Sequence, residues 1–107
     1  MDERQRDFLA VTGYVYLQHG AAANAADLLE TAHIARPHDR CVARLLAYAY
    51  LQLRRFRECL ELTDYLLNGY GNQEPLQVWL FRCRALYGLG RSQEATELWS
   101  RVRRGGK

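Results

Sequence analysis

Apolar residues recur every three to four positions along nearly the whole chain, with charged and polar residues between them. This spacing is the period of a helix that buries one face, and no stretch alternates in the two-residue rhythm of a half-buried strand. Glycine, proline and capping residues divide the pattern into six segments. We therefore predict an all-α fold with helices at about 5–19, 22–35, 40–53, 56–68, 75–88 and 92–104.

Residues at the ends of these segments support the boundaries. Gly20 suits the positive φ that follows a helix C-terminus. Asp39 and Ser92 are expected to be N-caps, and Pro75 suits the first turn of the fifth helix. The joint at Arg54 has no glycine, so we predict a turn there by analogy with the neighbouring joints.

The six segments form three pairs that repeat one sequence pattern. Small, aromatic and leucine residues recur after 34 residues and then after 36, with a two-residue insertion inside 68–73. The matching residues are Leu9, Gly13, Tyr16, Gly20, Ala25, Leu29, Ala32 and Pro37, then Ala43, Ala47, Tyr50, Cys59 and Leu66, then Trp79, Cys83, Leu86, Gly90, Ala95, Trp99 and Val102.

This pattern is that of the tetratricopeptide repeat (TPR), a helix–turn–helix unit of about 34 residues. We predict one TPR domain over 1–107, with repeats at about 6–39, 40–73 and 76–104. Because each helical pair buries its apolar face only against the next pair, the three should stack into a short right-handed superhelix with a concave groove.

Composition and charge argue against several classes of function. The net charge is +3, but twelve acidic residues are scattered among fourteen arginines and one lysine, so no continuous basic stripe predicts a nucleic-acid interface. Cys59 and Cys83 occupy slots that need small buried residues, and no histidine shares a face with a cysteine. We therefore expect no metal site and no other cofactor.

The sequence also lacks the marks of an enzyme or a membrane protein. It has no paired carboxylates, no nucleophile with a base and no phosphate-binding loop, so we expect no catalytic activity. No stretch approaches the roughly 20 apolar residues that cross a bilayer. The charged start, residues 1–7, does not resemble a signal peptide. We predict a cytoplasmic protein without membrane insertion.

In TPR arrays the first helix of each pair lines the concave face. Its inward places hold tyrosines and leucines that would form an exposed apolar patch, which a monomer seldom keeps without a partner. The predicted partner-binding groove consists of Tyr14, Leu17, Gln18, Arg44, Tyr48, Leu51, Gln52, Leu80, Arg84 and Tyr87.

We expect this groove to bind an amphipathic helix or an extended segment of another protein. Arg44 and Arg84 would pair with acidic groups of that segment. The alternative is that so short an array partly closes its groove, with Tyr14 and Tyr48 packed on each other.

The first two repeats resemble a known family. Residues 4–9 and 13–20, followed by Ala25, Leu28, Leu29, Arg36-Pro37 and the stretch 46–51, resemble the Y-type (YscY/SctY) chaperones of bacterial type III secretion. The resemblance covers most of 4–67 and is looser after Asn68. It implies a chaperone that binds a small secreted X-type partner (YscX/SctX) and presents it to the cytosolic domain of an SctV-like export gate.

Two alternatives stay open. Chaperones of needle subunits have a similar length and also use a three-repeat groove, so another type III substrate, such as a needle subunit, is the alternative client. A TPR scaffold or regulatory protein would instead use the last helix and its arginines, Arg101, Arg103 and Arg104, to contact an acidic surface.

Overall fold

The computed structural model describes residues 2–68 and 73–105. Its helices are α1 (Glu3–Gln18), α2 (Ala22–Ala35), α3 (Arg40–Gln52), α4 (Phe56–Leu67), α5 (Leu76–Gly88) and α6 (Ser92–Arg103). The described residues include no strand, and every helix begins and ends within two residues of its expected bound. The all-α prediction is confirmed. Most of the insertion predicted within 68–73 lies outside the described residues.

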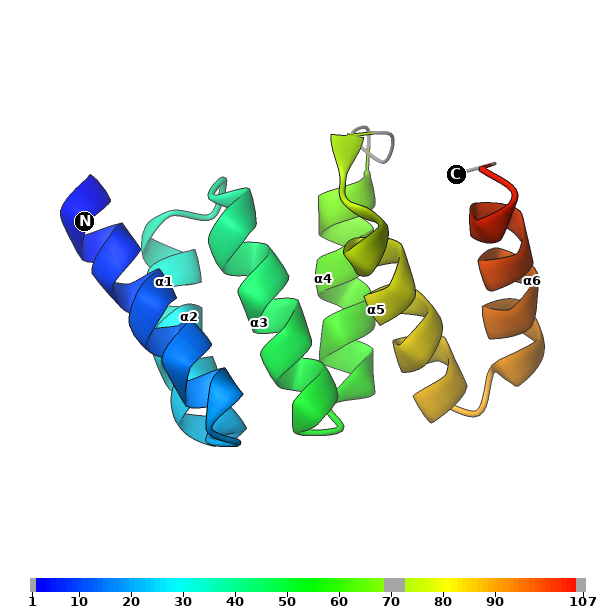
Figure 1. The fold of residues 1–107 in the computed structure, drawn as a ribbon, viewed down its shortest axis with the longest axis horizontal. Coiled ribbons are helices and arrows are strands. Elements are labelled where there is room, and N and C mark those ends of the chain that lie inside the picture. The colour runs from blue at the N-terminus through cyan, green and yellow to red at the C-terminus, as the bar shows by residue number, and fades with distance from the viewer. Residues whose placement is uncertain (1, 69–72, 106–107) are drawn as a thin grey trace.

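The helices pack in chain order, each against the next, in an elongated body of 39 × 26 × 19 Å (Figure 1). The odd-numbered helices also contact one another, α1 with α3 and α3 with α5. Within the described chain, α2, α4 and α6 do not approach one another within 8 Å between Cα atoms. The odd-numbered helices therefore form one continuous layer, which we call the α1–α3–α5 face.

The turn inside each helical pair has the same geometry in all three pairs. A residue with positive φ follows the odd-numbered helix: Gly20 at 75°, Arg54 at 60° and Gly90 at 81°. The amide of the next residue then donates to the carbonyl five residues before it, at 2.8–2.9 Å. This is the Schellman motif that ends many helices. The turn predicted at Arg54 by analogy is confirmed.

Arg54 adopts a conformation that glycine accepts at little cost and that other L-residues adopt with strain. Replacing Arg54 by glycine should therefore raise the free energy of unfolding by about 0.5–1 kcal/mol, measured by urea denaturation. The control is Arg57→Gly, an exposed position inside α4 where glycine should lower stability by about 1 kcal/mol. Lower stability of the Arg54→Gly variant would contradict the strain.

Two expected helix starts need correction. Ser92 is the first residue of α6 and not its N-cap, which is Arg91. The Schellman turn places Arg91 in the same backbone conformation as Ala21 and Arg55, and none of these three residues makes a side-chain cap. Pro75 is likewise the N-cap of α5, which begins one residue later. Asp39 was predicted correctly, because its carboxylate accepts from the amide of Val42 at 3.2 Å.

Small residues allow the helices of each pair to approach closely. A Cβ added to Gly13 of α1 would lie 2.9 Å from Cγ of Leu29 in α2. The main core runs from α1 to α5, and a second cluster joins α5 to α6. In this second cluster Val102 is buried and Trp99 is partly buried, so α6 packs its apolar side inward.

Candidate partner-binding face

Most residues of the predicted groove are accessible on the α1–α3–α5 face. Tyr14, Gln18, Gln52, Leu80 and Arg84 are exposed, and Tyr87 is 71% exposed. On α5, Leu80 and Tyr87 continue a stripe that begins at Leu76, which is also exposed. Spacings of four and seven residues place these three side chains along one side of the helix. The exposed apolar part of the predicted site is therefore concentrated on α5.

Leu17 and Leu51 do not belong to this accessible surface. They are only 5% and 4% exposed and pack in the main core. Both occupy the same place in their repeats as Tyr87, at offsets of 34 and 36 residues. The next odd-numbered helix packs beside α1 and beside α3, whereas no later described helix packs beside α5 in this way. The same slot is therefore core in two pairs and surface in the third.

The side chain of Tyr48 is partly buried by packing inside the molecule. Its ring stacks on Phe81 of α5 with the centroids 5.5 Å apart and the planes 13° apart. The alternative prediction of a partly closed groove had Tyr48 packed on Tyr14, but the stacking partner of Tyr48 is Phe81, and Tyr14 remains exposed. This stack joins α3 to α5 and leaves Tyr14 and Tyr87 accessible.

Arg44 already has a carboxylate partner inside the chain. Its Nη1 lies 3.2 Å from Oε2 of Glu74, and Arg40 forms an ion pair with the other carboxylate oxygen. The Glu74 side chain is only 1% exposed, just before α5. Glu74 could not be predicted from the sequence pattern, because its role depends on residues 30 and 34 positions away. Arg84 is exposed and is the better placed of the two predicted arginines to meet an acidic partner.

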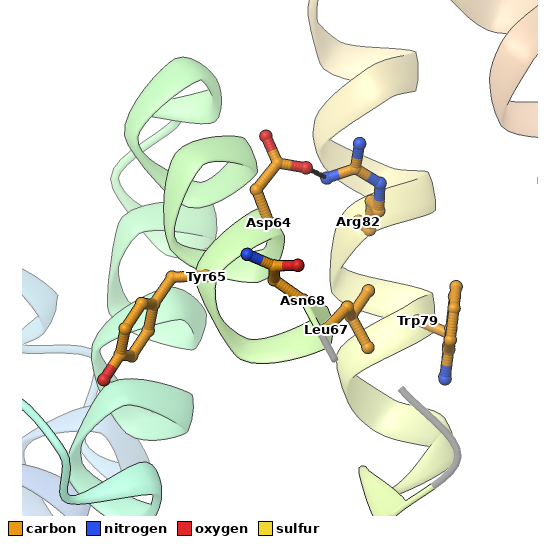
Figure 2. A pocket seen from close by; sticks show the side chains of 6 residues that line it. All are labelled: Asp64, Tyr65, Leu67, Asn68, Trp79 and Arg82. Atoms are coloured by element: carbon orange, nitrogen blue, oxygen red, sulfur yellow. Dashed lines mark ion pairs between the residues drawn. The ribbon is translucent and has the colours of Figure 1, made fainter. Parts of the chain in front are cut away.

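A separate hollow of about 500 Å³ lies between α4 and α5 (Figure 2). Asp64 and Arg82 point toward each other across it and form an ion pair, while Tyr65 points away and donates to the carbonyl of Pro37 at 2.7 Å. Nε1 of Trp79 is buried without a hydrogen-bond partner among the described residues. None of the predicted groove residues lines this hollow, so it is not part of the α1–α3–α5 face.

The three cysteines differ in accessibility. All are free thiols; Cys41 is exposed, whereas Cys59 and Cys83 are buried, as their small-residue slots predicted. Burial raises the pKa of Cys59 to about 12 and also raises the pKa of Cys83. Because the thiolate is the reactive form, both buried cysteines should be inert in the folded chain.

Iodoacetamide at pH 8 should therefore modify Cys41 rapidly and Cys59 only as fast as the chain unfolds. Mass spectrometry of the time course should show one fast addition, at residue 41, and Cys41→Ser should remove it. Fast modification of Cys59 at pH 8 would contradict its burial.

The raised pKa of Cys59 also means that the free energy of unfolding falls as pH rises from about 9 toward 12, since the thiol of the unfolded chain ionises first.

The described residues contain no group of three or more histidine, cysteine, aspartate or glutamate side chains placed to hold a metal ion. Among the same residues, no helix has both the length and the apolar character needed to cross a bilayer. Comparison with models of known protein families and with curated protein sequences gives no match.

Proposed function

We propose that the chain is a three-repeat TPR chaperone of bacterial type III secretion that binds a small secreted X-type protein on its α1–α3–α5 face. The three identical turns at offsets of 34 and 36 residues support a repeat architecture. The contacts of α1 with α3 and of α3 with α5, without equivalent contacts between the described even-numbered helices, support curvature that places the odd-numbered helices on the concave side of a superhelix.

The observation that carries the proposal is the exposed stripe on α5, Leu76, Leu80 and Tyr87. Burial of apolar surface contributes about 25 cal/mol per Å², so covering these side chains favours binding of an amphipathic segment. Arg84 lies in the same stripe and can pair with an acidic group of the client. Arg44 contributes less, because its guanidinium already pairs with Glu74 inside the chain.

In this mechanism the face replaces water around the apolar side chains of an aggregation-prone client segment. The client then stays unassembled in the bacterial cytoplasm until the complex meets the SctV-like export gate. Release follows from a difference in affinity between free and gate-bound complexes, since the sequence has no phosphate-binding loop that would couple release to ATP. The chaperone would act in the cytoplasm, at the periphery of the secretion apparatus.

Co-expression of the tagged chain with the X-type protein of the same bacterium tests the proposal. We expect a soluble complex that co-purifies, whereas the X-type protein expressed alone should aggregate. A parallel pull-down from the secreting bacterium, with mass spectrometry of the bound protein, distinguishes an X-type client from a needle subunit. Recovery of the chain without any small secreted protein in both experiments would reject the proposal.

A further inference from the structure

The outer side of α1 carries a second exposed apolar surface. Phe8, Val11 and Val15 are 69%, 61% and 45% exposed. Their spacing of three and four residues places them in one stripe, which we call the α1 outer stripe. It differs from the core-facing side of α1, where Ala10, Gly13 and Leu17 are buried. Three large apolar side chains exposed together indicate an interaction surface.

The equivalent positions in the other two repeats are buried or partly buried. At offsets of 34 and then 36 residues the outer stripe becomes Val42, Leu45 and Ala49 in α3, and Val78, Phe81 and Ala85 in α5. Four of these six residues have no exposed surface, and Leu45 and Phe81 pack against the main core. The outer stripe is therefore as apolar as the equivalent residues of α3 and α5, but those residues are covered by other helices and the stripe is not.

The molecule also shows what covers such a position. On α5, the covering elements are the two helices of the preceding pair, α3 and α4. Tyr48 of α3 stacks on Phe81, and a Cβ added to Gly88, three residues beyond Ala85, would lie 2.5 Å from the ring of Phe56 in α4. Both contacts come from apolar sides of amphipathic helices. A helix of the same kind is the occupant that fits the outer stripe.

A second copy of this chain fits less well. Toward the next helical pair, α4 presents Phe56, Leu60 and Leu67. The equivalent residues of α6 are Ser92, Thr96 and Arg103, and these three are exposed. At the far end of one copy, α1 of another copy would therefore meet apolar side chains only on α5, at Leu80 and Tyr87, and polar residues at these positions of α6. Two α1 helices facing each other would supply one covering helix, where the preceding pair supplies two.

We propose that the outer stripe of α1 binds an amphipathic helix of the client, which stacks on α1 as a preceding helical pair stacks on α3 or α5. This inference rests on the proposed function for the existence of a client. The bound helix would present apolar residues at intervals of three to four positions. At the N-terminal end of the stripe lies a hollow of about 570 Å³, lined by Arg4, Gln5, Phe8 and Leu9. This hollow can receive one bulky side chain of the bound helix.

The test measures the dissociation rate of the co-purified complex with the X-type protein for three variants. Val11→Asp lies in the outer stripe, Leu80→Asp in the α5 stripe, and Ile34→Asp is a control at another exposed apolar position, on α2. Thermal unfolding of each free variant checks that it stays folded, as expected at exposed positions. We expect Val11→Asp to accelerate dissociation at least 30-fold and Ile34→Asp to leave it within twofold.

The outcomes separate the two proposals. Faster dissociation with both Val11→Asp and Leu80→Asp is the expected result and supports both stripes, whereas loss of the complex with Val11→Asp alone supports the outer stripe and rejects the α5 stripe as the binding site. The reverse result, or an unchanged rate with Val11→Asp, overturns the inference and leaves the proposed function intact. Light scattering that shows a dimeric free chain, monomeric only with Val11→Asp, would assign the stripe to a second copy and also overturn it. Absence of any complex with the unaltered chain rejects both.

Discussion

Replacing Glu74 by alanine is expected to lower the free energy of unfolding by about 2–4 kcal/mol. The Glu74 side chain is almost fully buried and holds both Arg40 and Arg44, so it ties the start of α5 to α3. Removing one partner of a buried ion pair usually costs about 3–5 kcal/mol. The cost should be smaller here, because the two arginines are about one-third exposed and can regain water.

Urea denaturation followed by circular dichroism gives this difference directly. Glu61→Ala, at an exposed position on α4, is the matched control and should change stability by less than about 0.5 kcal/mol. Glu74→Gln should fall between the two, since the amide keeps a hydrogen-bond acceptor but not the charge. A loss below about 0.5 kcal/mol for Glu74→Ala would show that the two ion pairs do not stabilise the fold.

The double variant Leu80→Asp/Tyr87→Ala is expected to accelerate client dissociation about 100-fold while the free chain keeps its melting temperature within about 2 °C. Tyr87 is largely exposed and neither residue belongs to a core cluster, so neither change removes core packing. Fully burying a leucine or an aromatic side chain stabilises a complex by about 1.5–3 kcal/mol, and a factor of 100 corresponds to about 2.7 kcal/mol.

The matched control is Ile34→Ala, which removes an exposed apolar side chain from α2 and should leave dissociation unchanged. Leu51→Asp is not a useful variant for this purpose, because Leu51 is buried and a charge there would unfold the chain. If the double variant dissociates at the rate of the unaltered complex, the α5 stripe does not bind the client.

The helices could be predicted from the sequence because local signals agree along the whole chain. The apolar period, the positive-φ glycines Gly20 and Gly90, and the Asp39 cap all point to the same boundaries. Arg54 could be placed only by comparison with the other repeats, since arginine itself does not favour a positive φ. The prediction of Ser92 as an N-cap was wrong, although serine is a good capping residue. The backbone of the preceding turn makes Arg91 the N-cap, so Ser92 is the first residue of the helix.

The candidate site could be predicted only in part, because exposure depends on neighbouring pairs and not on one helix. Leu17, Leu51 and Tyr87 occupy one slot, yet the first two are buried by the next odd-numbered helix and the third is exposed. Glu74 was missed because a loop carboxylate acquires its role from two arginines of a distant helix. Both effects are tertiary, so no pattern within one helix reveals them.

Photo-crosslinking shows directly whether the client lies on the α1–α3–α5 face. Tyr87 and, in a separate variant, Ile34 are each replaced by p-benzoyl-phenylalanine, and the complex with the X-type protein is irradiated. Both positions are exposed in the free chain, Tyr87 on α5 and Ile34 on α2. We expect a covalent adduct with the client from position 87 and none from position 34. An adduct from position 34 alone, in a complex that forms normally, would show that the client lies on another face.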